Sequence, residues 1–152
     1  MTELDATDRL ILRLLAEDGR RSYADVARDT GLSTSAAHQR VRRLEQRGAI
    51  TGYAAQLDPV ATGLPLTAFV SVTPTDPAAP DDAPERLAHL AAIEACHSVA
   101  GEESYILKVR VPSPADLEVL LQEIRSAAGV STRTTVVLST AWEARTPPPL
   151  QG

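Results

Sequence analysis

The sequence predicts an α+β protein in two parts, with three short helices first and then the order strand, helix, strand, strand, helix, strand. In the first part, apolar residues recur at helical spacing in three segments that begin after Asp or Ser and end near Gly. Beyond Gly63, segments rich in strand formers are separated by two segments with helical spacing. This order is typical of helices packed on one face of an antiparallel sheet.

The first two predicted helices are defined by their ends. Asp5 can cap a first helix that ends near Gly19, and its apolar stripe is Leu10, Ile11, Leu14 and Leu15. Ser22 can cap a second helix, with Asp25 as a weaker form of the capping box. Gly31 is placed to end this helix in the left-handed conformation. The residues expected to pack between the helices are Val26, Ala27 and Leu32.

The third predicted helix has one apolar and one polar face. Ser33 can cap it, Gly48 closes it, and its buried stripe is Ala37, Val41 and Leu44, spaced i, i+4 and i+7. In a helix-turn-helix, the opposite, polar and cationic face of the second helix of the motif contacts base edges and phosphates. The predicted DNA-binding residues are Ser33, chiefly as the cap, with Thr34, Ser35, His38, Gln39, Arg42 and Arg43. Arg40 flanks the apolar stripe, so it either holds the helix in place or contacts DNA.

Charge is divided unevenly along the chain, whose formal net charge is -5. Residues 1–60 carry 9 basic and 9 acidic side chains, whereas residues 61–152 carry 6 basic and 11 acidic ones. Between Ser33 and Arg47, four Arg side chains face a single Glu, which leaves a local basic patch suited to DNA. The alternative is that this helix face is only solvated, as most polar helix faces are.

The remaining elements follow in order. Residues 49–57 are interpreted as an extended wing or linker strand leading to Asp58-Pro59. Strands are expected at Leu66–Thr73, Ala95–Val99, Tyr105–Val111 and Arg133–Ala141, helices at Glu85–Ile93 and Pro114–Ala128, and a turn at Gly101–Ser104. The order is that of a ferredoxin-like unit, with two helices on one face of a four-stranded sheet. The other face, expected to include Phe69, Val109 and Val137, needs a cover, and dimerisation can supply it.

Composition limits the class of protein. No apolar run among the 152 residues approaches the roughly 20 needed to span a bilayer, and the first residues do not resemble a signal peptide, so a cytoplasmic location without membrane contact is expected. The single cysteine, Cys96, is expected to be buried, and it cannot pair with the adjacent His97 because neighbours on a strand point to opposite faces. No metal-ligand spacing, phosphate loop or catalytic constellation is found, so neither an enzyme nor a cofactor is predicted. The Pro- and Asp-rich residues 74–84 are interpreted as a solvated loop.

Several motifs in the same order closely resemble the Lrp/AsnC (feast/famine) family of transcription regulators. They are residues 4–12 (LDATDRLIL), 31–33 (GLS), 40–45 (RVRRLE), 48–53 (GAITGY) and 99–105 (VAGEESY). The resemblance implies an N-terminal winged helix-turn-helix that binds palindromic operators. It also implies a ferredoxin-like domain, called RAM in that family, that dimerises and binds a small amino acid between subunits. Dimers of the family often assemble into tetramers or octamers.

The resemblance also implies where the effector binds. The corresponding loop residues are Ala100, Gly101, Glu102, Glu103, Ser104 and Tyr105, and Thr134 matches a region that lines the site from a neighbouring subunit. The family usually has Asp where this chain has Ser104, and a hydroxyl carries no countercharge for an ammonium group. We therefore expect either an altered choice of effector or weakened amino-acid binding, with Glu102 or Glu103 as a substitute for the family's Asp. The alternative is that both glutamates are merely exposed loop residues.

The predicted domains are residues 1–52 (helix-turn-helix), 53–64 (linker), 65–146 (dimerisation and effector binding) and 147–152 (a frayed tail). The competing hypothesis is a metabolite-binding module that senses an amino acid and regulates an enzyme by direct contact. A small enzyme is a third and weaker hypothesis.

Overall fold

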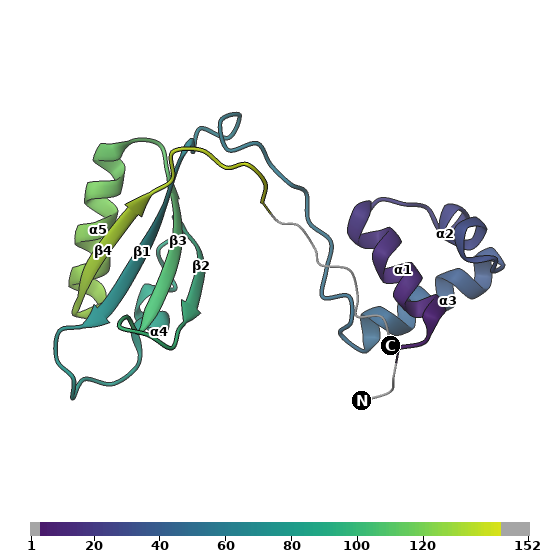
Figure 1. Ribbon diagram of the computed structural model, residues 1–152, viewed down its shortest axis with the longest axis horizontal. Coiled ribbons are helices and arrows are strands. Elements are labelled where there is room, and N and C mark those ends of the chain that lie inside the picture. Colours follow the sequence, from purple (N-terminus) through teal and green to yellow (C-terminus); the bar gives the residue numbers. More distant parts are fainter. Residues whose placement is uncertain (1–3, 144–152) are drawn as a thin grey trace. The chain divides into compact units, whose positions relative to one another are not determined.

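The protein is described by a computed structural model for residues 4–143, which form two units (Figure 1). The first unit comprises the residues up to Gln56 together with Trp142 and Glu143, and the second spans Leu57–Ala141. Each unit is described by itself. The predicted tail at 147–152 and the last residues of the predicted second domain lie outside the described residues.

The first unit contains three helices, α1 (Ala6–Glu17), α2 (Tyr23–Thr30) and α3 (Thr34–Gln46). Each has the predicted N-cap: Asp5 accepts the amide of Asp8 at 2.7 Å, Ser22 that of Asp25 at 3.1 Å, and Ser33 that of Ala36 at 3.2 Å. Gly31 has φ 69°, the left-handed conformation that ends α2. The capping residues Ser22 and Gly31 therefore set both ends of α2, and Ser33 sets the start of α3.

One apolar cluster holds these helices together. It consists of Ile11, Val26, Ala27, Ala37, Val41 and Leu44. Burying a Val, Leu or Ile side chain of this kind contributes about 1.5–3 kcal/mol. The cluster includes the whole predicted stripe of the third helix, so the opposite face of α3 is left to solvent.

The segment that was predicted as an extended wing or linker strand forms no strand. Residues 47–65, all of them described, form no strand. The chain leaves α3 through Gly48 (φ 71°), and the amides of Ala49 and Ile50 both donate to the Leu44 carbonyl. An extended segment becomes a strand only when another strand offers its hydrogen-bonding edge, and the described residues of the first unit form helices but no strand.

The second unit has the predicted order of elements. These are β1 (Leu66–Pro74), α4 (Ala83–Leu87), β2 (Ile93–Ser98), β3 (Tyr105–Val111), α5 (Pro114–Ala128) and β4 (Val130–Val136). The strands form one antiparallel sheet in the order β2-β3-β1-β4, and α4 and α5 lie together on one side of it (Figure 1). The ferredoxin-like α+β architecture is thus confirmed.

The predicted bounds are wrong for α4, β2 and β4, and the largest differences are in α4 and β4. The helix expected at Glu85–Ile93 ends at Leu87, because the amides of Leu90 and Ile93 make tight turns and Ile93 already pairs with β3. The strand expected at Arg133–Ala141 runs instead from Val130 to Val136. Gly129 (φ 64°) ends α5, and the chain pairs with β1 at once. In both places strand pairing overrides the local pattern.

The sheet buries one face under the helices. Alternate residues of β1 and β3, among them Ala68, Val70 and Leu107, are fully buried. Val109 is also fully buried because it pairs with Ala68, so its predicted place on the open face is wrong. Phe69 is 42% exposed on the open face, as predicted, and Val137 is half-buried.

Among residues 4–143 no helix is both long and apolar enough to cross a membrane.

Candidate DNA interface and ligand loop

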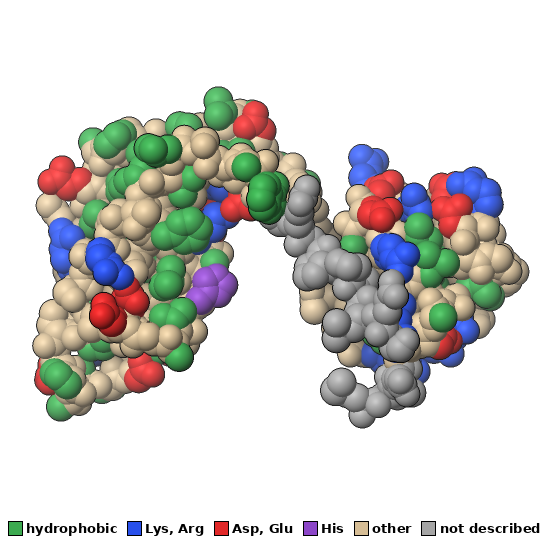
Figure 2. Space-filling model, viewed as in Figure 1, with side chains coloured by type: hydrophobic (Ala, Val, Ile, Leu, Met, Phe, Trp, Pro, Cys, Tyr) green, Lys and Arg blue, Asp and Glu red, His purple; other side chains and the backbone are tan. Residues whose placement is uncertain are grey.

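The polar face of α3 is exposed as predicted. Ser33, Thr34, Ser35, His38, Gln39, Arg42 and Arg43 are all exposed. Gln39, Arg42, Arg43 and Gln46 line a shallow hollow of about 390 Å³. Gln46 is absent from the prediction, although its position four residues after Arg42 places it on the same face. In Figure 2 basic and acidic side chains lie close together on the visible face of this unit.

Ser33 serves as the cap of α3. Besides accepting the amide of Ala36, its hydroxyl oxygen lies 3.2 Å from that of Ser35. The hydroxyl is therefore engaged within the protein, which agrees with its predicted role chiefly as a cap.

Arg40 holds α3 against α1, which decides between its two predicted roles. Its guanidinium donates to Asp5 at 2.6 Å and to Asp8 at 2.8 Å. Asp8 is buried, and the hydrogen bond from Arg40 is the main cause that lowers the pKa of Asp5. Arg40 therefore joins the N-terminus of α1 to the middle of the third helix.

The ring of His38 lies against the ring of Tyr23 at the start of α2. The ring centroids are 4.6 Å apart and the rings are inclined by 65°, an edge-to-face arrangement. Tyr23 is 42% exposed. No sequence pattern pointed to this pair, because the two residues lie on different helices and only their packing brings them together.

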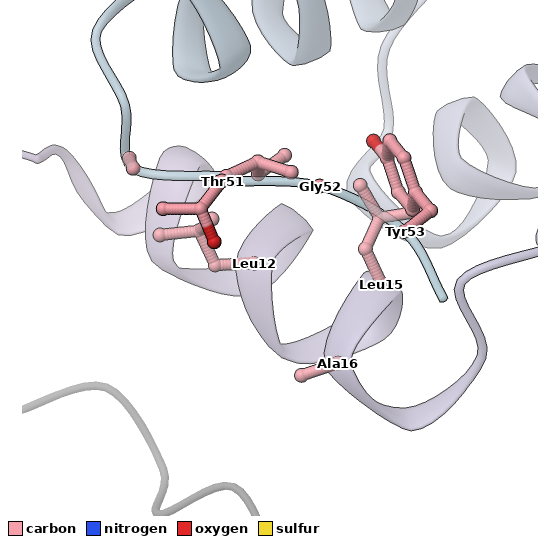
Figure 3. A pocket seen from close by; sticks show the side chains of 8 residues that line it. Leu12, Leu15, Ala16, Thr51, Gly52 and Tyr53 are labelled. Carbon is pink, nitrogen blue, oxygen red and sulfur yellow. The ribbon is translucent and has the colours of Figure 1, made fainter. Parts of the chain in front are cut away.

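A hollow of about 370 Å³ lies between α1 and the segment that follows α3. Figure 3 shows Thr51 beside Leu12 and Tyr53 beside Leu15. The Tyr53 hydroxyl donates to Glu45 at 3.0 Å, and burial raises its pKa to about 12. These contacts fasten the start of the predicted linker to the first unit.

The predicted effector loop connects β2 and β3. The Val99 amide donates to the Ser104 carbonyl at 3.1 Å, and the Ser104 amide donates to the Val72 carbonyl at 3.1 Å. These bonds tie the base of the loop to β1. Ala100, Gly101 and Glu102 are exposed, while Glu103 and Ser104 are half-buried.

Tyr105 lies apart from the exposed loop residues. It is 6% exposed, packs in the core, and donates from its hydroxyl to Asp81 at 2.6 Å. That hydrogen bond is the main cause that raises the pKa of Tyr105 to about 12. Asp81 belongs to the Pro- and Asp-rich loop, so this loop is anchored beside the effector loop, an attachment that its composition did not reveal.

The structure brings Glu103 to Arg133 rather than to Thr134. Thr134 pairs with Val70 and lies on the helix-covered side of the sheet. Arg133 pairs with Ser71 on the open side and forms an ion pair with Glu103. The alternation of side chains along a strand was enough to place Arg133 and Thr134 on opposite faces of the sheet. It could not show that Arg133 contacts Glu103 in the loop. Of the two glutamates proposed as substitutes for the family's Asp, Glu102 is the more exposed.

Cys96 is exposed, so its predicted burial is wrong. It lies on β2, an edge strand of the sheet that has a neighbouring strand on one side only. Partial burial raises the pKa of its thiol. It pairs with Leu107 and His97 pairs with Ile106, so the two side chains lie on opposite faces as predicted.

An exposed, arginine-bearing third helix in a three-helix unit is the arrangement of a helix-turn-helix DNA-binding domain. A sequence model of the AsnC-type helix-turn-helix domain matches residues 4–45, and a model of the Lrp/AsnC ligand binding domain matches residues 67–147. The chain belongs to the Lrp/AsnC family of transcriptional regulators.

Named relatives support this assignment. The HTH-type transcriptional regulator LrpA of Mycobacterium tuberculosis is 54% identical over 142 residues, which cover 93% of this chain and 95% of that protein. The leucine-responsive regulatory protein of Escherichia coli K12 is 39% identical over 141 residues, covering 90% and 85%. A solved structure of the feast or famine regulatory protein from M. tuberculosis complexed with L-methionine has a TM-score of 0.95 and 52% identity, covering 97% of this chain and 100% of that one.

The comparisons decide between the three hypotheses for this chain. The relatives are transcriptional regulators, so the family is not one of enzymes. The match of residues 4–45 to a DNA-binding domain accounts for the first unit. A metabolite-binding module that acts only by protein contact would give this unit no function.

Proposed function

We propose that this regulator binds a palindromic DNA operator as a homodimer and changes its binding when an amino acid occupies the second unit. The observation that carries the proposal is the exposed polar face of α3, with Gln39, Arg42 and Arg43 around one hollow. Side chains of these types donate to phosphates, to guanine edges and to adenine edges.

Two copies of α3 enter successive major grooves on one side of the DNA, about one helical turn, or roughly 34–36 Å, apart. Arg42 and Arg43 contact phosphates or guanine edges. Thr34, Ser35, His38 and Gln39 contact base edges. Ser33 keeps the N-terminus of the helix ordered, as its cap hydrogen bond supports.

The open face of the sheet is the proposed dimer interface. Phe69 is 42% exposed there, and an exposed apolar ring on a sheet face favours association. Larger assemblies, tetramers or octamers, are built from this dimer.

The proposed effector is an amino acid, supported by the M. tuberculosis relative solved with L-methionine. The proposed site is the loop Ala100–Ser104, completed by Thr134 of a neighbouring subunit. Because Ser104 supplies no countercharge, Glu102 is the carboxylate with the greater exposure for an ammonium group. Tyr105 supports the loop from the core.

The test is a fluorescence-anisotropy titration against a genomic fragment with the protein's own upstream region, across salt concentrations and across the twenty common amino acids. We expect salt-sensitive, sequence-preferring binding that shifts with at least one amino acid. Specific binding that ignores every amino acid contradicts the effector proposal alone. Absence of affinity for any DNA at low salt contradicts the whole proposal.

A further inference from the structure

The contact between Tyr23 and His38 has no role in the core of the first unit. Tyr23 is outside the apolar cluster and is 42% exposed, and His38 is exposed as well. A large aromatic side chain at the start of α2 therefore rests on a polar residue of α3. Its 4.6 Å centroid distance and 65° inclination lie within the range that aromatic pairs prefer.

Both rings stand on rigid supports. The first turn of α2 is fixed by Ser22, whose hydroxyl accepts the Asp25 amide and donates to its carboxylate at 2.6 Å. The turn to α3 is closed by the Leu32 amide, which donates to the Ala27 carbonyl at 2.9 Å. The position of one ring relative to the other is thus determined by packed helices and not by a loop.

His38 lies at the edge of the exposed face of α3. It directly follows the buried Ala37 and precedes Arg42 by four residues, so it adjoins the hollow formed by Gln39, Arg42 and Arg43. An imidazole offers a donor and an acceptor, and either can pair with a base edge in the major groove. A free imidazole loses rotational freedom when it makes that contact, whereas one already held by a neighbouring ring loses less.

We propose that Tyr23 is a positioning residue that holds His38 toward the DNA, so that the two residues together determine the preferred base pair at one operator position. Tyr23 acts through the edge-to-face contact of its ring, and its hydroxyl is not needed. This inference rests on the proposed contact of His38 with DNA, and the experiment separates failure of one from failure of the other.

The experiment uses the full chain and the duplex that it enriches from a randomised DNA library. Affinities are measured by anisotropy for that duplex, for duplexes with each base pair replaced in turn, and for unrelated DNA. The variants are Tyr23→Leu, Tyr23→Phe, His38→Ala and the double variant Tyr23→Leu with His38→Ala. His89→Ala, an exposed histidine of the second unit, is the matched control.

We expect Tyr23→Leu to weaken binding to the selected duplex about three- to tenfold, the loss of one aromatic pair, and to leave binding to unrelated DNA and the salt slope unchanged. We expect Tyr23→Leu to lose its preference at the same base pair as His38→Ala. The double variant should lose no more affinity for the selected duplex than His38→Ala alone. Tyr23→Phe and His89→Ala keep the original preference. Because Tyr23→Phe preserves the ring, its retained preference also shows that the site at residue 23 tolerates substitution.

The outcomes that overturn the inference are distinct. If His38→Ala changes preference at no position, His38 does not contact a base, and both the contact and the inference fail. If His38→Ala relaxes one position while Tyr23→Leu does not, only the role of Tyr23 fails. A uniform loss of affinity on all duplexes in both Tyr23→Leu and Tyr23→Phe shows that the Tyr23 hydroxyl contacts a phosphate instead, and this also overturns the inference.

Discussion

At the residue scale, the basic side chains of α3 divide into two kinds. Arg42 and Arg43 are exposed around the hollow, whereas Arg40 is held by two carboxylates of the α1 region. A sequence count of positive charges treats all three alike. Their expected effects on DNA binding differ, because only a side chain that meets phosphate releases counterions.

Replacing Arg42 or Arg43 by Ala should therefore reduce the magnitude of the salt slope of DNA binding by about one if the side chain contacts phosphate. The measurement is log affinity against log salt concentration. Arg86→Ala is the control, because Arg86 pairs with Asp82 in the second unit. Slopes and affinities unchanged in both α3 variants would remove these residues from the interface.

Replacing Arg40 by Ala should leave the salt slope unchanged and lower the free energy of unfolding of the first unit by about 1–3 kcal/mol, because the buried Asp8 loses a charged hydrogen bond. Urea unfolding measures this. An Arg40→Ala variant as stable as the parent, with a smaller salt slope, would place Arg40 at the DNA instead.

The ion pair between Arg40 and Asp5 predicts a pH dependence of stability. Because Arg40 lowers the folded-state pKa of Asp5 below its usual 3.8, the ion pair stabilises the fold above that pH and its contribution is lost as the pH falls through the lower, folded-state value. Stability of the parent should drop in this acidic range more steeply than that of Asp5→Asn. Parallel curves of unfolding free energy against pH would contradict the assignment.

At the element scale, the loss of stability expected on replacing a glycine depends on the backbone conformation of that glycine. Gly129 ends α5 at φ 64°, whereas Gly52 has no positive φ, and an added Cβ would meet no heavy atom within 4 Å at either residue. The difference between them is therefore one of backbone conformation and not of space. Because β4 begins directly after Gly129, the last turn of α5 also sets the register of the sheet edge.

Replacing Gly129 by Ala should lower the free energy of unfolding of the second unit by about 1–2 kcal/mol, the cost of the left-handed conformation for a residue with a Cβ. Gly52→Ala should change stability by less than about 0.5 kcal/mol. Chemical denaturation of the two variants checks this. Equal effects would show that the backbone at residue 129 relaxes without cost.

At the scale of the whole molecule, the sheet has one covered and one open face. Phe69 lies on the open face, while Val119 is an apolar residue of α5 that is 56% exposed. The two are matched in exposure and differ in location. Hydrophobic side chains adjoin charged ones over the visible part of this unit in Figure 2.

Replacing Phe69 by Arg should therefore shift the protein from dimer toward monomer, because a charge would be buried without a partner if the open faces met. Val119→Arg should leave the association unchanged. Sedimentation velocity distinguishes the two variants. A Phe69→Arg protein that remains fully dimeric at low micromolar concentration would contradict the proposed interface.

The sequence by itself determined the elements whose signals are local. The caps Asp5, Ser22 and Ser33, the buried stripe of α3 and the limits of β3 and α5 follow from spacing and from the chemistry of single residues. The exposed face of α3 was predictable for the same reason, since a buried stripe defines its opposite face.

Only the tertiary structure decided what depends on residues distant in the sequence. The start of β4, the early end of α4 and the missing wing all depend on whether a strand finds a partner. The ion pairs of Arg40, the anchoring of Tyr105 by Asp81 and the contact of Tyr23 with His38 join separate elements. Spacing along a chain reports which face a residue occupies, but only packing selects the residue that it meets.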